Sequence, residues 1–220
     1  MAAPSLPIVI RDDIKQALLH NRAVVALEST IISHGMSFSV ESTTAVAAVA
    51  QGYCEPIPGT VRSHTIVFAG MPYPQNLDTA KRVEAVLQQH GALPATIALM
   101  HGKVCIGLDS AQLQQLASQG PKFTKVSRRD ILPVLASQSF GATTVAATML
   151  LAHAAGIRVF VTGGIGGVHR GVQDTMDISA DLTELGRTPV AVVCAGVKSV
   201  RTPKRTIRRS TTTIVNRSSS

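Results

Sequence analysis

Short runs of apolar residues recur along the chain, and segments of mixed polarity separate them. Runs of this kind occupy residues 23–27, 94–100, 103–108, 157–162 and 189–194. Such runs, with few polar residues, are typical of strands in a sheet that is covered on both faces. A turn at His101 and Gly102 separates two of them, and a shorter strand is predicted at 122–126.

Several segments between these runs carry apolar residues at helical spacing. In residues 74–91 this pattern is continuous, and Gly91 suits the C-terminal cap of a helix. Further helices are predicted at 13–20, 109–120, 127–137 and 141–156. Pro133 fits the third of these only if that helix begins near Asp130, because proline cannot donate a backbone hydrogen bond inside a helix. The alternation of strands and helices predicts a layered α/β fold.

The composition indicates one folded domain with an aliphatic core. The chain has 220 residues, of which 45% are hydrophobic and only 3% aromatic. The net charge of +8 suggests a nucleic-acid partner, but residues 200–220 contain six basic residues and no acid, which leaves +2 for residues 1–199. We therefore expect a folded domain at 1–199, a disordered basic tail at 200–220, and no specific nucleic acid as partner.

The sequence also bears on the compartment. No apolar run approaches the roughly 20 residues that a membrane-spanning helix needs. Asp12 and Asp13 lie near the start of the chain, which lacks the pattern of a secretory signal. The three cysteines, Cys54, Cys105 and Cys194, show no CxxC spacing. We therefore expect reduced thiols in a cytoplasmic protein without a membrane partner.

Polar groups at the ends of the predicted strands are candidates for chemistry. Glu28 follows the run 23–27, where burial of a carboxyl group is costly unless the group is paired or used. It could act as a general acid, or it could pair with a lysine. The glycine-rich residues 162–171 follow another strand and could bind a phosphate or form a tight turn. Their spacing does not match a nucleotide-binding motif.

Two lysines leave similar alternatives open. Lys198 follows the run 189–194 and could be an uncharged nucleophile, or it could extend into solvent. Lys125, with Arg128 and Arg129 nearby, could bind a phosphate or lie on a solvated face. Neither lysine can be assigned from its neighbours along the chain.

Three aspartates follow the glycine-rich segment, at Asp174, Asp177 and Asp181. Carboxylate oxygens suit hard divalent cations such as Mg²⁺. In the alternative interpretation, Ser179 or Asp177 caps a short helix. Taken with Glu28 and the lysines, these residues indicate an enzyme that acts on a small phosphorylated sugar or carbonyl compound.

Seven short motifs, taken in chain order, resemble those of the pseudouridine-5′-phosphate glycosidase family. They read VVALESTIISHGM, PATIA, TKVSRRD, GATTVAATM, FVTGGIGGVHRG, DISADL and VVCAGVKS, and the resemblance extends over most of residues 13–36 and 72–199. The resemblance implies a layered α/β/α fold, a homotrimer and a divalent cation, typically Mn²⁺. It also implies reversible cleavage of the C–C glycosidic bond of pseudouridine 5′-phosphate with water, which gives uracil and ribose 5-phosphate.

The resemblance further implies a role for each residue that matches a family motif. Glu28 would be the proton donor, and Lys198 would attack C1′ of the ribose to form a ring-opened imine, a Schiff base. Asp177 would bind the metal ion. The substrate would contact Lys125, Val145, Ser179, Ala180 and Asp181. Opening the ring and forming an imine with the lysine lets the C–C bond break, for which two-carboxylate glycosidase chemistry is poorly suited.

Two departures from the family pattern accompany this match. Residues 37–71 separate motifs that are contiguous in the family, so we interpret them as an atypical folded insertion or a retained intron. After Ser199 the family continues, whereas residues 200–220 match nothing in it, and we expect the fold to be C-terminally incomplete. An alternative function is therefore an inactive relative that binds phosphosugar or assembles with full-length subunits.

Overall fold

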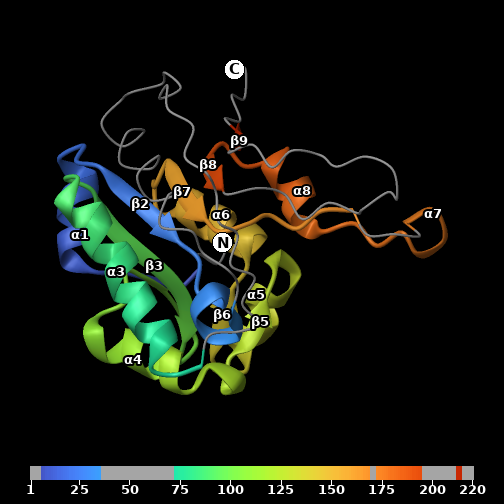
Figure 1. The fold of residues 1–220 in the computed structure, drawn as a ribbon, viewed down its shortest axis with the longest axis horizontal. Coiled ribbons are helices and arrows are strands. Elements are labelled where there is room, and N and C mark those ends of the chain that lie inside the picture. Colours follow the sequence, from blue (N-terminus) through green and yellow to red (C-terminus); the bar gives the residue numbers. More distant parts are fainter. Residues whose placement is uncertain (1–5, 36–71, 169–171, 195–211, 215–220) are drawn as a thin grey trace, which may run out of the picture.

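A computed structural model describes residues 6–35, 72–168, 172–194 and 212–214 of the chain (Figure 1). The described strands form one mixed nine-stranded sheet in the order β1-β4-β3-β2-β7-β8-β9, with β6 paired to both β3 and β5. The strands are β1 (Ile8–Ile10), β2 (Val24–Leu27), β3 (Leu93–Met100), β4 (Lys103–Ile106), β5 (Thr124–Val126), β6 (Gly141–Thr143), β7 (Val159–Thr162), β8 (Ala191–Cys194) and β9 (Thr212–Ile214).

Helices connect most of these strands. The α-helices are α1 (Asp12–Leu19), α3 (Gln75–Gln89), α4 (Ser110–Ser118), α5 (Ile131–Ala136), α6 (Val145–Ala154), α7 (Val172–Thr175) and α8 (Ala180–Leu185). Three shorter helices complete the described part, namely the π-helix η1 (Ile31–Gly35) and the 3₁₀-helices η2 (Gly120–Lys122) and η3 (Arg128–Asp130).

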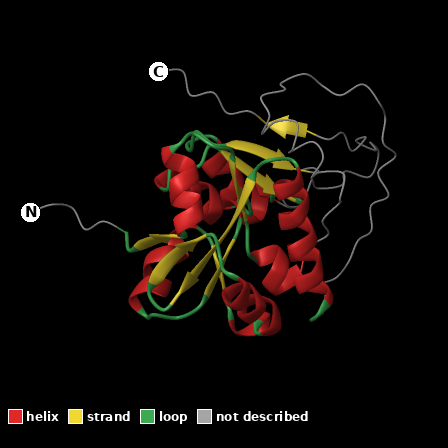
Figure 2. Ribbon diagram, turned by 90° about the vertical axis from the view of Figure 1, so that its left-hand side faces the viewer, coloured by secondary structure: helices red, strands yellow, loops and turns green. Residues whose placement is uncertain are grey.

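Helices cover both faces of the sheet (Figure 2), and the residues of β2 show why. Val24 and Ala26 belong to the core shared with α1, α6 and α8, whereas Val25 and Leu27 pack with α3 on the opposite face. All four side chains are at most 8% exposed. Successive residues of a strand alternate between faces, so an uninterrupted apolar run is what a sheet buried on both sides requires. The predicted layered α/β/α fold is confirmed.

Several predicted ends of helices and strands agree with the structure. Asp109 accepts a hydrogen bond from the Gln112 backbone, and the Gln112 side chain accepts one from the Asp109 backbone, which forms a capping box at the start of α4. The predicted turn at His101 and Gly102 has φ of 51° and 71°. Pro133 lies in the first turn of α5, directly after η3, where its missing N–H costs no helical hydrogen bond.

Three expectations differ from the structure. The predicted helix at 141–156 is wrong at its start, because Gly141–Thr143 form β6. A Cβ atom on Gly141 would lie 2.6 Å from Val126 Cγ2, so glycine lets this strand pack against β5. The short strand β1 was not predicted. Thr212–Ile214, expected to be disordered, form β9 antiparallel to β8, while residues 36–71 and the rest of the tail lie outside the described residues.

Two features bear on the compartment predictions. Cys105 and Cys194 are buried as thiols, and burial raises the pKa of the Cys105 thiol; Cys54 lies outside the described residues. Within the described ranges, no helix combines the length and the apolar character that crossing a membrane requires.

Candidate active site

The site lies at the carboxyl ends of two adjacent parallel strands, β2 and β7, whose following helices pack on opposite faces of the sheet. β2 is parallel to both of its neighbours, β3 and β7, and Leu27 pairs with Val161 in the ladder. After β2 the chain continues to α3 on one face, whereas after β7 it continues to α8, which packs with α6 on the other face. In α/β sheets, ligands bind in the crevice at the carboxyl ends of strands where such connections diverge. Glu28 and Thr162 stand at this position.

Glu28 is held by hydroxyl groups. It is only 4% exposed, and Thr30 Oγ1 donates to its Oε2 at 2.6 Å. Thr162 Oγ1, from the last residue of β7, donates to Oε1. Hydrogen bonds from two hydroxyl groups offset part of the cost of taking a carboxylate out of water. These contacts explain how an acid can follow a buried strand.

Ser29 anchors the segment that carries Glu28. Its Oγ accepts from the Thr143 backbone N–H at 2.7 Å and lies 3.2 Å from Thr143 Oγ1. Thr143 Oγ1 in turn donates to the carbonyl of Ile97 at 2.7 Å and accepts from Thr148 at 2.9 Å. Because the Thr143 proton is directed to that carbonyl, Ser29 donates to Thr143 Oγ1. The end of β2 is therefore tied to β3, β6 and α6.

A pocket opens beside Glu28. Its walls come from β2, β3, β7, η1 and α3, and they include Glu28, Ile31, Thr79 and Val83. Most of the lining is apolar. Asn76 also lines the pocket, but its amide bridges η1 and α4 by donating to the carbonyls of Ile32 and Ala117, both at 2.9 Å. A small ligand in this space would meet one carboxyl group among mainly apolar side chains.

The π-helix η1 leads from Glu28 toward Lys125. π-helices are rare and occur frequently at functional sites. The helix packs so closely on η2 that a Cβ atom on Gly120 would lie 2.4 Å from the Ser33 carbonyl oxygen. Burial and then the positive charge of Lys125 lower the pKa of His34, while a hydrogen bond with the Phe123 backbone acts in the opposite direction. Lys125 is thus close enough to the end of η1 to act on it electrostatically.

Asp181 connects two of the predicted motifs. Its Oδ1 accepts from the Ala146 backbone at the start of α6 at 3.0 Å, and its Oδ2 accepts from Gly166 N–H in the glycine-rich segment at 2.9 Å. A Cβ atom on Gly166 would lie 2.2 Å from Ser179 Oγ, so glycine is needed for this approach. Ser179 caps α8 by accepting from the Asp181 backbone at 3.3 Å, as one of the two interpretations predicts.

The structure thus brings Val145, Ser179 and Asp181 together at the start of α6. The Val145 side chain is buried, whereas Ala180 is exposed. The Thr144 hydroxyl, next to Val145, is buried and has no hydrogen-bond partner among the described residues. Asp181 is 9% exposed and uses both carboxylate oxygens within the protein.

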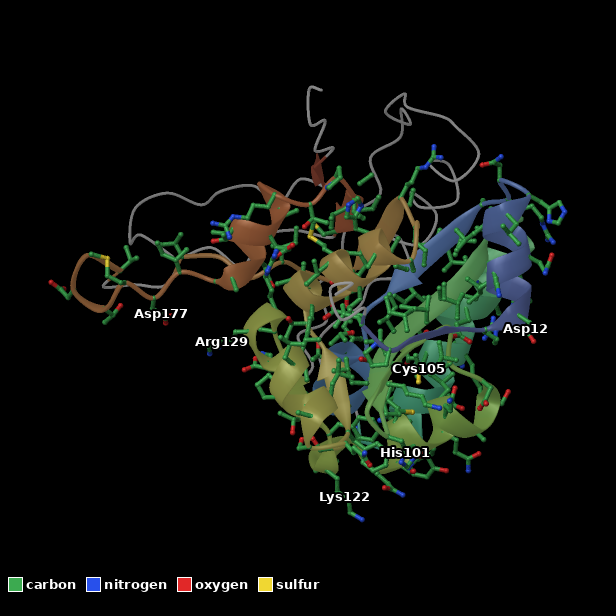
Figure 3. The ribbon with its side chains drawn as sticks, turned by 180° about the vertical axis from the view of Figure 1, so that it is seen from behind. Asp12, His101, Cys105, Lys122, Arg129 and Asp177 are labelled. Carbon is green, nitrogen blue, oxygen red and sulfur yellow. The ribbon has the colours of Figure 1, made fainter. Side chains whose placement is uncertain are left out.

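One predicted residue, Asp177, is not brought to this cluster, and another, Lys198, lies outside the described residues. Asp177 is exposed and lies on the segment that extends beyond α8, away from the body of the molecule (Figure 3). Across the described ranges, no three His, Cys, Asp or Glu side chains gather as a metal-binding group. Lys198 lies outside the described residues, four positions after Cys194, where β8 ends. His169 and Arg170, in the glycine-rich segment, also lie outside them.

The hydrogen-bond partners of Glu28 and Arg128 were not identified from the sequence. Thr30 and Thr162 hold Glu28, yet a hydroxyl residue at a strand end gives no signal of its partner. Arg128, considered above as a phosphate ligand, instead donates from Nη1 to both oxygens of Glu184, at 2.8 and 2.7 Å. Arg129 is 90% exposed. Thr30 and Thr162 could have been identified as candidates because they lie within the ALEST and FVTGG motifs.

The fold and the site together define an α/β protein with a buried carboxyl group at the carboxyl end of a parallel sheet. The family model described as indigoidine synthase A like protein matches residues 13–53 and 62–217. The chain belongs to this family. The match includes residues 37–53, 62–71 and 200–217. The interpretation of residues 37–71 as an atypical insertion, and of 200–220 as a separate tail, stays a prediction.

Curated relatives agree with the motif resemblance. The chain is 48% identical over 193 residues to a pseudouridine-5′-phosphate glycosidase of Arabidopsis thaliana, covering 88% of this chain and 48% of the relative. It is 48% identical over 188 residues to the enzyme of the same name from Alkaliphilus metalliredigens, covering 86% and 50%. The predicted relationship to pseudouridine-5′-phosphate glycosidases is confirmed. The chain spans about half the length of these relatives.

Two solved structures share the fold. The prealnumycin C-glycosynthase AlnA in complex with ribulose 5-phosphate superposes with a TM-score of 0.65 and 36% identity, over 89% of this chain and 52% of that one. An indigoidine synthase A-like protein from Thermotoga maritima gives a TM-score of 0.62 and 25% identity, over 90% and 52%.

Proposed function

We propose that this chain carries the catalytic residues of a pseudouridine-5′-phosphate glycosidase. The reaction is reversible cleavage of the C–C glycosidic bond of pseudouridine 5′-phosphate with water, giving uracil and ribose 5-phosphate. Family membership and the curated relatives support it. A structural relative that is a C-glycosynthase holding a pentulose phosphate supports the same substrate class.

The observation that carries the proposal is the arrangement of three parallel strand ends. β8 lies parallel to β7, which lies parallel to β2, so Glu28, Thr162 and Cys194 share one edge of the sheet. Lys198 follows Cys194 by four residues. A nucleophile carried just past β8 would therefore approach the same crevice as the acid that follows β2.

In the proposed mechanism, the uncharged amine of Lys198 attacks C1′ of the ribose. Glu28 donates its proton to the ring oxygen, so the bond from C1′ to the ring oxygen breaks, the sugar ring opens, and the lysine nitrogen is bonded to C1′ as an amine that then loses one proton. The nitrogen lone pair forms a protonated imine with C1′ as the C–C bond to the base breaks, and the bonding electron pair leaves with the base carbon, which takes up a proton to give uracil. Water then hydrolyses the imine, which releases ribose 5-phosphate and regenerates the amine.

Substrate binding would use the elements around this crevice. Lys125 would attract the phosphate, which its cationic side chain suits. Ser179 and Ala180 would contact the sugar, and Val145 would do so through its backbone, since its side chain is buried. Asp181 would act mainly as an anchor for these segments, because both of its carboxylate oxygens already accept backbone hydrogen bonds.

A divalent cation, typically Mn²⁺, is implied by the family resemblance, and we propose Asp177 as its protein ligand. One exposed carboxylate fits an ion that keeps most of its water ligands and also binds substrate oxygens. The ion would supply positive charge near the substrate. A homotrimer and a cytoplasmic location complete the proposal.

A second candidate is an inactive relative that binds phosphosugar or assembles with full-length subunits. The chain spans 48% and 50% of the two curated relatives compared above. A preorganised site needs the surrounding structure that holds its groups in place.

Incubation of the chain with uracil, ribose 5-phosphate and Mn²⁺ tests the two candidates. We expect pseudouridine 5′-phosphate to form, and borohydride to trap a ribose phosphate adduct on Lys198 that mass spectrometry detects. Lys198→Ala should abolish both signals, whereas Lys204→Ala, a matched change in the basic tail, should leave both unchanged. A folded chain that yields neither product nor adduct would support the inactive relative.

A further inference from the structure

Thr162 occupies a particular position relative to Glu28. It is the last residue of β7, it is fully buried, and it follows Val161, the ladder partner of Leu27. Glu28 follows Leu27 on the neighbouring strand. Parallel pairing therefore places the threonine hydroxyl beside the carboxyl group, and Thr162 Oγ1 contacts Glu28 Oε1.

The Thr162 hydroxyl has two acceptors within reach. One is Glu28 Oε1, and the other is the carbonyl of Gly164, 3.4 Å from Oγ1. The backbone N–H of Gly164 donates to the same Oγ1 at 3.3 Å. A hydroxyl group has one proton to donate and two lone pairs that accept. Thr162 can therefore direct its proton to either acceptor while Gly164 continues to donate to it.

We propose that Thr162 is a positioning residue whose hydroxyl follows the protonation state of Glu28. When Glu28 is ionised, Thr162 donates to Oε1 and Thr30 donates to Oε2. When Glu28 carries its proton on Oε1, that proton is donated to Thr162 Oγ1, and the threonine proton turns to the Gly164 carbonyl. No proton passes between the two side chains, because only the hydroxyl rotates.

Thr30 provides an internal comparison. Its hydroxyl donates to Glu28 Oε2 at 2.6 Å, and within the described residues it contacts no second acceptor. Thr30 therefore donates to Oε2 in both forms of the acid, whether Oε2 belongs to the carboxylate or is the carbonyl oxygen of the protonated group, and its hydroxyl does not have to turn. Thr162 can support both forms of the acid at nearly constant geometry, because its second acceptor lies in the glycine-rich segment that Asp181 anchors through Gly166.

This inference rests on the proposed function, in which Glu28 must hold a proton and then release it. A group with a hydrogen-bond partner for only one protonation state would leave a buried polar atom unpaired in the other state, at a cost. A hydroxyl with two acceptors removes that cost. The chain thereby keeps one geometry of the acid before and after proton transfer.

The test compares Thr162→Val, which removes the hydroxyl at nearly constant volume, with Thr162→Ser, which restores it. The ¹³C resonance of the Glu28 carboxyl group is followed against pH in ¹³C-glutamate-labelled protein, with Glu28→Gln to assign the signal. Loss of a donor to the ionised form should move the titration midpoint of Thr162→Val to higher pH by about one unit. Thr162→Ser should titrate close to the wild type, and circular dichroism checks that each variant is folded.

Turnover gives a second readout where product forms. A proton donor is active only while protonated, so activity falls as pH rises through its titration. In Thr162→Val the pH at which activity falls should increase together with the NMR midpoint, and Thr162→Ser should restore the wild-type pH profile.

The outcomes separate the inference from the proposed function. If the Glu28 midpoint shifts in Thr162→Val but the chain makes no product, the role of Thr162 is supported and the proposed enzymatic function is rejected. An unshifted midpoint in folded Thr162→Val would overturn the role of Thr162, whether or not the chain is active. Failure of serine to restore the midpoint would overturn it as well.

Discussion

Arg128 donates from a single nitrogen, Nη1, to both carboxylate oxygens of Glu184, at 2.8 and 2.7 Å. The glutamate side chain is 2% exposed, whereas the arginine is 47% exposed. Thr188 Oγ1 also donates to this carboxylate. The pair links η3, which follows the Lys125 strand, to α8, which carries Asp181. It thereby joins two of the segments that surround the site.

Loss of Arg128 should destabilise the fold. Arg128→Ala leaves a buried carboxylate without its cation, which in a fully buried pair costs about 3–5 kcal/mol. Because the arginine is half exposed and Thr188 remains, we expect about 1–3 kcal/mol in urea unfolding. Arg129→Ala is the matched control, since Arg129 is 90% exposed and should change stability by less than about 0.5 kcal/mol. Equal effects of the two changes would contradict the role given to the pair.

A methyl group on Gly166 should disturb the glycine-rich segment. The added Cβ atom would lie 2.2 Å from Ser179 Oγ and 2.8 Å from Asp181 Oδ2, which forces these groups apart. We expect Gly166→Ala to lose about 1–3 kcal/mol of stability. Gly186→Ala serves as control, because the nearest atom to its Cβ lies 3.6 Å away. Thermal unfolding of both variants measures the difference, and an unaffected Gly166→Ala would show that the segment adapts.

The fold should gain stability as pH rises through the range just below the ordinary histidine pKa. Burial and the charge of Lys125 lower the pKa of His34 below the ordinary value for histidine, so the unfolded chain binds the proton more tightly. Stability is then lost as pH falls below about 6.5. His34→Gln should remove this contribution from the pH dependence of urea unfolding.

Lys125→Met should reduce the His34 contribution without abolishing it, because burial is the larger cause. A Lys103→Met variant is the matched control for loss of one positive charge. An unchanged pH dependence in His34→Gln would contradict this assignment.

Asp177 should bind Mn²⁺ in the folded chain if it is the metal ligand. Asp177→Asn removes one negative charge from a site with few protein ligands, so we expect the affinity for Mn²⁺ to fall about tenfold or more. Electron paramagnetic resonance of unbound Mn²⁺ measures it directly. Asp174→Asn, another exposed aspartate on the same segment, should bind as the wild type does. An equal loss of Mn²⁺ affinity in both variants would indicate attraction by the overall negative charge of the segment rather than a specific site at Asp177.

The sequence predicted the layers of the fold and the location of the acid more reliably than the surroundings of the acid. Apolar runs such as 94–100 identify strands because burial on both faces leaves little room for polar residues. Gly141 was misread, because a glycine before an alanine-rich helix shows nothing of the strand that packs behind it. One partner of Glu28, Thr162, and one partner of Glu184, Arg128, lie 134 and 56 positions away along the chain. Such pairings follow from tertiary contacts rather than from local pattern.

One strand pairing constrains the proposed nucleophile. Cys194 lies opposite Thr212 in the antiparallel ladder between β8 and β9, so the two residues that flank 195–211 are paired with each other. Lys198 is four residues from Cys194, and even a fully extended backbone would keep its Cα within about 14 Å of that anchor. Truncation after Ser199 would therefore remove more than positive charge. It would also remove β9, whose pairing with β8 anchors the chain on the far side of Lys198.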